Sequence, residues 1–165
     1  MKDKIKIAIL IFIAVFFLYR AYRIYFYTPD IDFSSLKLKD LSGKEVALNI
    51  SDLDKTMVVC FQTWCSPCVA EMQLVQKHFE KFKFLTIYFI TDESEVKVES
   101  LKRRLKLDSL NFLISVEPLS ELGIESFPTI FILKDGQIIE KHKGAIVDES
   151  NLEDEIFHLN EMLKN

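Results

Sequence analysis

The sequence predicts an α/β domain with a mixed β-sheet and helices on both faces, preceded by one N-terminal transmembrane helix. The continuous apolar run Met57–Phe61 is typical of a strand that is buried on both faces, and the largely apolar run Phe84–Ile90 predicts a second buried strand. An amphipathic helical pattern follows each run, which is the order of parallel strands joined by helical crossovers. A later Asp-Gly turn between two strand-like runs predicts an antiparallel hairpin, which makes the sheet mixed. The 165 residues are enough for one domain of ordinary size.

The N-terminal segment has the pattern of an uncleaved signal anchor. Three lysines within the first six residues precede Ile7–Tyr19, an uncharged apolar run of 13 residues, and Arg20 and Arg23 follow among aromatic residues. The stretch Ile7–Tyr27 has 21 residues, and a membrane-spanning helix needs ~20. No pair of small residues marks a cleavage site after the run, so the anchor is favoured over a cleaved signal peptide. We therefore expect residues 1–27 to form the cytoplasmic start and the anchor, and residues 28–165 to form the domain.

The charge distribution predicts where this domain lies. Residues 1–27 contain five Lys or Arg and one Asp, which leaves 16 basic and 24 acidic side chains in residues 28–165, a net charge of −8. Positive charge is higher before the apolar run than after it, which favours a cytoplasmic N-terminus and a domain on the other side of the membrane. A domain this acidic is a poor candidate for nucleic-acid binding, which needs a basic surface.

The domain begins with a predicted β-hairpin. Strand-like runs at Phe33–Leu38 and Val46–Ile50 flank a turn at Leu41–Lys44. The buried strand Met57–Phe61 follows. A helix then opens near Pro67, which is tolerated in a first helical turn because its missing N–H would have no partner there.

The rest of the chain shows helical and strand periodicities in alternation. In the helix after Pro67, apolar residues recur at spacings of three and four as far as Phe82, so it should end near Lys83. The later pattern predicts, in order, the strand Phe84–Ile90, a helix Ser94–Lys106 with Ser94 as a possible N-cap, a short strand Leu110–Val116, a helical turn or loop Leu119–Ile124, the hairpin strands Thr129–Leu133 and Gln137–Lys143, and a helix Asn151–Leu163.

Two of the three cysteines, Cys65 and Cys68, lie two residues apart directly after the first buried strand. A zinc site would need two more ligands. Cys60 lies within a buried-strand pattern and the three histidines are scattered, so we expect no metal. A structural staple is also disfavoured, because a disulfide that closes so small a loop removes little chain entropy.

The position of the pair favours redox chemistry. Cys65 falls where a strand ends and a helix begins, and the unpaired N–H groups and partial positive charge of a helix N-terminus stabilise a thiolate. We expect Cys65 to be exposed and acidic, and Cys68 to be shielded one turn into the helix. This arrangement suits thiol–disulfide exchange.

The motif Thr63-Trp64-Cys65-Ser66-Pro67-Cys68 resembles the W-C-x-P-C active site of thioredoxin-like proteins. The hairpin pattern from Phe33 to Lys44, Glu71 after the pair, and the late Phe127-Pro128-Thr129 resemble the membrane-anchored TlpA/ResA branch of that family. The resemblance covers about residues 30–163.

The resemblance implies roles for individual residues. Cys65 matches the nucleophile and Cys68 the resolving cysteine. Pro128 matches a cis-proline that faces the disulfide and helps to bind substrate, with Trp64 and Phe127 beside it. Glu71 matches a glutamate that exchanges a proton with the resolving thiol, and the alternative for it is an ordinary solvated helix residue.

One position departs from the pattern of the family. Val59 stands where many thioredoxins have a buried Asp and where this branch often has Asn. Its side chain cannot transfer a proton, so Glu71 is the only obvious carboxylate for that task.

The predicted function is a membrane-anchored thiol–disulfide oxidoreductase that acts as a reductant, with no cofactor other than the Cys65–Cys68 disulfide. The resemblance implies a bacterial cytoplasmic membrane, with the domain facing the periplasm. Its expected partners are disulfide-bearing proteins, with apocytochrome c as a family-based candidate, and a membrane electron donor for re-reduction. Three alternatives stay open. The first is a thiol peroxidase of the peroxiredoxin group, in which a Thr lies three residues before the cysteine, whereas Thr63 lies two before Cys65. The second is a copper-handling thioredoxin-fold protein, which typically has two cysteines three residues apart and a distant His. The third is a redox-inactive interaction module.

Overall fold

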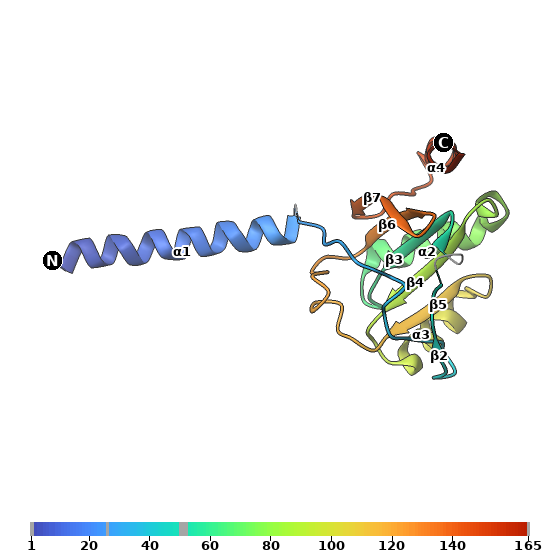
Figure 1. Ribbon diagram of the computed structural model, residues 1–165, viewed down its shortest axis with the longest axis horizontal. Helices are drawn as coiled ribbons and strands as arrows, with labels where there is room; N and C mark the ends of the chain where they lie inside the picture. Colours follow the sequence, from blue (N-terminus) through green and yellow to red (C-terminus); the bar gives the residue numbers. More distant parts are fainter. Residues whose placement is uncertain (1, 26, 50–52, 165) are drawn as a thin grey trace.

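The computed structural model describes residues 2–25, 27–49 and 53–164 and contains a helix followed by an α/β domain (Figure 1). Ile50, the last residue of the predicted hairpin, lies outside the described residues. The described strands form one seven-stranded sheet in the order β2-β1-β5-β4-β3-β6-β7. The strands are β1 Leu38–Lys39, β2 Glu45–Val46, β3 Thr56–Cys60, β4 Thr86–Thr91, β5 Asn111–Ser115, β6 Thr129–Lys134 and β7 Gln137–Lys143. The helices are α1 Lys2–Tyr25, α2 Ser66–Lys77, the 3₁₀ helix η2 Phe79–Phe82, α3 Glu95–Leu105 and α4 Leu152–Lys164.

Strand β3 lies in the interior of the sheet, and all five of its residues are buried. It pairs parallel with β4 and antiparallel with β6, so the sheet is mixed as predicted. In this register Cys60, at the end of β3, lies beside Ile90 on one side and Thr129 on the other. The chain therefore leaves β3 at the edge of the sheet where β4 ends and β6 begins.

Among the described residues, α2, α3 and α4 all bury side chains in one cluster on one face of the sheet, where the sequence predicted helices on both faces. Both parallel connections, β3 to β4 and β4 to β5, step the same way across the sheet, and right-handed crossovers in one direction pass over the same face. The other face is covered by the segment from Phe33 to Leu48 and by Leu119 and Ile124. Residues 119–123 form turns, in agreement with the helical turn or loop predicted there.

Helix α2 ends at Lys77, earlier than the predicted end near Lys83. His78 leaves the helical region with φ −113°, and the chain tightens into η2, where the Lys81 N–H donates to the His78 carbonyl at 2.9 Å. The apolar spacing continues through η2 because Phe82 is still buried in the helical cluster. Periodicity alone does not distinguish the two kinds of helix, since both place residues three apart on one side.

Both predicted hairpins are present. β6 and β7 are joined by the two-residue turn Asp135-Gly136, and both residues have positive φ (50° and 76°). A type I′ turn requires this conformation, which explains the Asp-Gly signal. β1 and β2 are only two residues each and turn through Gly43, which also has positive φ (82°).

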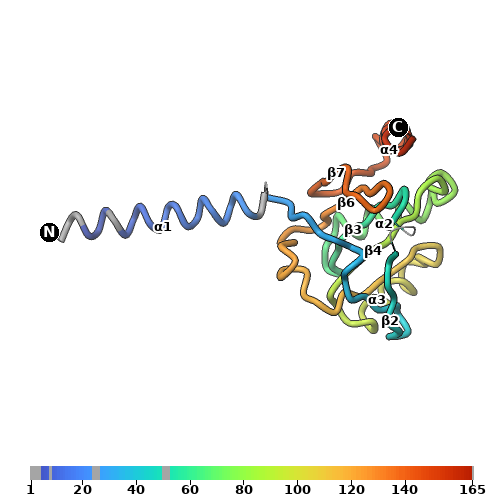
Figure 2. The backbone as a smooth tube through the Cα atoms, viewed as in Figure 1, coloured from blue at the N-terminus to red at the C-terminus, as the bar shows by residue number. Residues whose placement is uncertain are grey.

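Helix α1 extends away from the domain, and the N-terminus lies at its far end (Figures 1 and 2). Its segment Ile5–Arg23 has 19 residues with a mean hydropathy of 2.1, and none of that segment is buried. Its last turns contact the domain: Arg20 and Arg23 both pair with Glu125, at 3.5 and 3.2 Å, and Lys143 donates to the Arg23 carbonyl at 3.1 Å. By length and composition α1 can cross a membrane, as the sequence predicted.

Candidate active site

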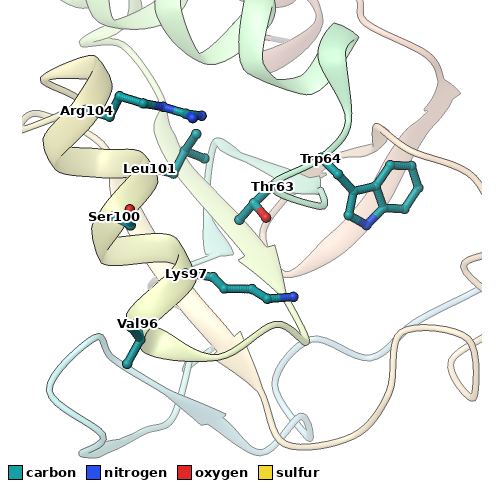
Figure 3. A pocket seen from close by; sticks show the side chains of 7 residues that line it. All are labelled: Thr63, Trp64, Val96, Lys97, Ser100, Leu101 and Arg104. Carbon is teal, nitrogen blue, oxygen red and sulfur yellow. The ribbon is translucent and has the colours of Figure 1, made fainter.

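The cysteine motif lies in the loop that joins β3 to α2, on the side facing α3 (Figure 3). The loop begins with Phe61, whose N–H donates to the Ile90 carbonyl at 3.0 Å and whose ring packs edge-on against Phe89 and Phe112. Phe61 is fully buried, so the start of the loop is fixed in the core. The position of β3 in the sheet therefore fixes where the motif loop begins.

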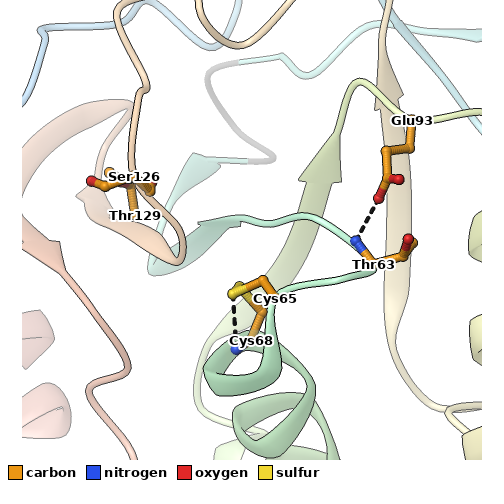
Figure 4. Close-up of a disulfide and its surroundings, with 6 residues drawn as sticks. All are labelled: Thr63, Cys65, Cys68, Glu93, Ser126 and Thr129. Carbon is orange, nitrogen blue, oxygen red and sulfur yellow. Dashed lines mark hydrogen bonds between the residues drawn. A yellow bond between two sulfur atoms is a disulfide. The ribbon is translucent and has the colours of Figure 1, made fainter. Parts of the chain in front are cut away.

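Cys65 and Cys68 form a disulfide, with Cα atoms 5.3 Å apart (Figure 4). Cys65 is the N-cap residue of α2, and its Sγ accepts a hydrogen bond from the Cys68 N–H at 3.3 Å. Pro67 stands at the start of the helix, as predicted. After reduction, a thiolate at the N-cap would face the same N–H and the positive end of the helix dipole, and both lower a thiol pKa.

The expectation that Cys65 is exposed is wrong for this oxidised state. Cys65 is 4% exposed and Cys68 is fully buried. The reason is that the Cys65 side chain turns in toward Cys68 to form the disulfide and to cap the helix. Trp64, at 71%, is exposed instead, together with Ser66 and Pro67 between the cysteines.

Trp64 meets the loop that precedes β6. Its ring contacts Phe127 edge-on, with centroids 6.1 Å apart. The Phe127–Pro128 bond is cis, as the resemblance implied, and Pro128 is buried. Because Thr129 pairs with Cys60 at the end of β3, this loop and the motif lie at the same edge of the sheet. The structure thus brings together Trp64, Phe127, Pro128 and the two cysteines.

Glu71 is not a solvated helix residue. It lies one turn after Cys68 on the buried side of α2 and is 1% exposed. Its Oε1 accepts hydrogen bonds from the N–H groups of Ile146 and Val147, at 3.0 and 3.3 Å, and its Oε2 has no partner among the described residues. Burial raises the pKa of Glu71 to about 7, against the opposing effect of the two hydrogen bonds. A carboxyl with this pKa can both accept and donate a proton near neutral pH.

Two carboxylates that the sequence analysis did not single out support the motif loop. The Gln62 side chain donates to Asp92 at 2.6 Å, and Asp92 also accepts the Leu119 N–H at 2.8 Å. The Thr63 N–H donates to Glu93, which also pairs with Lys97 at 3.0 Å (Figure 4). Burial alone would raise the pKa of Glu93, but these hydrogen bonds outweigh burial and lower it.

A sequence signal for these carboxylates did exist. Asp92 and Glu93 directly follow a buried strand that is parallel to β3, and the ends of neighbouring parallel strands meet at one edge of a sheet. Acidic residues at that position were therefore candidates for contact with the motif.

The third cysteine lies apart from the pair. Cys60 is buried in the cluster on the sheet face opposite to the one that holds Cys65 and Cys68. Burial raises the pKa of its thiol well above the usual range. Among the described residues no three His, Cys, Asp or Glu side chains gather as a metal site, and the expectation of no metal stays a prediction.

The AhpC/TSA family model matches residues 29–142, which is more than half of the chain. The chain belongs to the AhpC/TSA family. It is similar to the thiol-disulfide oxidoreductase ResA of Bacillus thuringiensis subsp. konkukian, with 28% identity over 129 residues that cover 75% of this chain and 69% of ResA. It is also similar to the thioredoxin-like protein YneN of Bacillus subtilis, with 29% identity over 122 residues that cover 70% of this chain and 69% of YneN.

Among solved structures, this AhpC/TSA family member resembles an uncharacterized thioredoxin-like protein from Porphyromonas gingivalis. The TM-score is 0.61 at 17% identity, over 83% of this chain and 95% of the other. At that identity the similarity shows the fold, which is thioredoxin-like. The family, the fold and the resemblance to the ResA branch are therefore confirmed.

The buried Glu71 makes the free energy of unfolding depend on pH. The folded carboxyl binds its proton more tightly than the unfolded one, so stability falls as pH rises from about 4.5 to about 7 and is constant above that range. The oxidised full-length protein should lose about 3 kcal/mol of unfolding free energy over that interval through this one group. Glu71→Gln should lack this component, as measured by urea unfolding in detergent at several pH values.

The exposed Glu121 provides the matched control, because Glu121→Gln removes the same charge from the surface of the domain. Its unfolding curves should follow those of the unchanged protein at every pH. If Glu71→Gln followed them as well, the carboxyl of Glu71 would have an ordinary pKa in the folded state.

Proposed function

We propose that this protein is a membrane-anchored thiol–disulfide oxidoreductase that reduces disulfides in proteins outside the cytoplasmic membrane. The observation that carries the proposal is the Cys65–Cys68 disulfide at the N-cap of α2, next to the exposed Trp64 and the cis Phe127–Pro128 bond. The similarity to proteins named thiol-disulfide oxidoreductase ResA supports the same class of enzyme.

The exchange proceeds in two displacements. In the reduced protein the Cys65 thiolate attacks one sulfur of the partner's disulfide, which forms a mixed disulfide and releases the other partner sulfur as a thiolate that takes up a proton. Cys68 then loses its proton and attacks Cys65 Sγ. This step forms the Cys65–Cys68 disulfide and releases the second partner thiol. Two electrons pass from the cysteine pair to the partner.

Glu71 is positioned to take the proton from Cys68 in the second step. Its pKa of about 7 lies close to ambient pH, where a general base works best. The hydrogen bonds from Ile146 and Val147 hold one oxygen and leave Oε2 without a partner among the described residues. Val59 is a buried apolar residue, so the central strand supplies no competing carboxylate at that position.

The residues around Cys65 fit disulfide exchange better than they fit peroxide reduction. The peroxidase alternative needs a Thr three residues before its cysteine, and Thr63 is two residues before Cys65. Its backbone N–H is also held by Glu93, on the α3 side of the loop. A resolving cysteine on the same helical turn, Cys68, serves exchange directly.

The residues between the cysteines support the reducing direction. Ser66 and Pro67 carry no positive charge that would stabilise the reduced thiolate strongly, which is how a very oxidising pair gains its potential. We expect a reduction potential near ~−270 mV for the full-length protein equilibrated with glutathione or dithiothreitol buffers. A value near ~−120 mV would make the protein an oxidant.

The two cysteines should behave differently in substrate trapping. Cys68→Ser leaves the nucleophile without a resolving thiol, so mixed disulfides with partner proteins should accumulate on Cys65. They can be isolated from membranes under non-reducing conditions and identified by mass spectrometry. Cys65→Ser should trap none, and trapping by that variant instead would reverse the two roles. Hydrogen peroxide turnover by the unchanged protein, at rates above those of disulfide exchange, would favour the peroxidase alternative.

We further propose that α1 anchors the domain. Support comes from the unburied apolar segment Ile5–Arg23, the excess of positive charge before it and the lack of a small-residue cleavage site after it. The mature protein should keep residues 1–27 and stay in the membrane fraction after carbonate extraction. A new N-terminus near residue 28, found by mass spectrometry, would show a cleaved signal peptide instead.

A further inference from the structure

A hollow of about 480 Å³ lies beside the motif loop, between Thr63 and helix α3. Its lining combines apolar surface with two cations, as Figure 3 shows: Lys97, Leu101 and Arg104 extend from α3 toward the loop that carries Thr63. The exposed Trp64, the residue before the nucleophile, forms its rim on the motif side, and Val96, which is 76% exposed, lines it on α3.

The charge of this hollow is opposite to that of the domain. Residues 28–165 have a net charge of −8, whereas α3 carries four Lys or Arg and two Glu. Lys97 pairs with Glu93 at 3.0 Å, so its charge is largely balanced. Arg104 is exposed, and within the described residues neither an ion pair nor a hydrogen bond engages its guanidinium. Arg104 is therefore the cation in this hollow that can pair with a partner.

We propose that this hollow, defined by Thr63, Trp64, Val96, Lys97, Leu101 and Arg104, docks an acidic segment next to the cysteine of the disulfide-bearing protein that the pair reduces. The inference rests on the proposed disulfide exchange and adds to it the chemistry of the partner. Arg104 pairs with a carboxylate of that segment, while Trp64 and Val96 contact its apolar atoms. An exposed pair of this kind selects among partners and speeds encounter more than it adds affinity.

The test uses pre-reduced full-length protein in a nonionic detergent. The probes are short peptides whose single cysteine is linked by a disulfide to a chromophoric aryl thiol. One peptide carries glutamates on both sides of the cysteine, and the other carries glutamines. Cys65 attacks the peptide sulfur and releases the coloured thiolate, and Cys68 then releases the peptide thiol. The readout is the ratio of the second-order rate constants for the acidic and the neutral probe.

Arg104→Glu and Arg103→Glu form a matched pair, because they make the same charge change at neighbouring positions of α3. Arg103 is exposed, does not line the hollow, and donates to the Glu99 carbonyl at 3.3 Å. Arg104→Glu should lower the acidic-to-neutral ratio about fivefold at low salt, which is the size of one favourable exposed charge pair. Arg103→Glu should leave the ratio near that of the unchanged protein, and high salt should remove the difference.

Three results would overturn the docking proposal. Equal falls in both variants would show that only the overall charge of the domain matters. An unchanged ratio in Arg104→Glu would show that Arg104 does not meet the acidic segment. A dimer of the unchanged protein that Arg104→Glu converts to a monomer would assign the hollow to a second copy of this chain. Failure of exchange itself has a different signature, since no probe would then react faster with the unchanged protein than with Cys65→Ser.

Discussion

The site depends on the position of one buried strand. β3 pairs with β4 on one side and with β6 on the other, and all its residues are buried. Its end is therefore the meeting point of three segments: the motif loop, the Asp92-Glu93 pair after β4, and the Phe127-Pro128 pair before β6. Each contributes a different part, namely the redox pair, the carboxylates that hold the loop, and the apolar surface against Trp64.

Two carboxylates near the motif, the half-buried Glu93 and the buried Glu71, have pKa values shifted in opposite directions. Glu93 accepts hydrogen bonds from Thr63 and Lys97, and its pKa is lowered despite its partial burial, so it stays ionised and holds the loop. Glu71 accepts only two backbone N–H groups through one oxygen, and burial raises its pKa to about 7. Each carboxylate accepts from two residues, so the difference lies in the deeper burial of Glu71 and in the positive charge of Lys97 beside Glu93.

Local patterns in the sequence were sufficient for the redox pair, the central strand and the Asp135-Gly136 hairpin, because each depends on residues that are neighbours along the chain. The cis bond before Pro128 required the family resemblance. Features that arise from tertiary packing were missed: the contact of Glu93 with Thr63 joins residues 30 apart, and the low exposure of Cys65 follows from its disulfide. The placement of α2, α3 and α4 on one face depends on strand order, which periodicity does not specify.

The alternation of side chains along β3 also keeps Cys60 from forming a wrong disulfide with Cys65 or Cys68. Cys60 and the pair lie five and eight residues apart in sequence, close enough for mispaired disulfides in a flexible chain. In the fold a full layer of sheet separates them, since Cys60 points to one face while Cys65 and Cys68 belong to the other. The raised pKa of Cys60 keeps it a thiol, which is a poor nucleophile. The sheet thus keeps Cys60 out of contact with the reactive pair, and repeated turnover does not form a mispaired disulfide with Cys60 unless the domain unfolds.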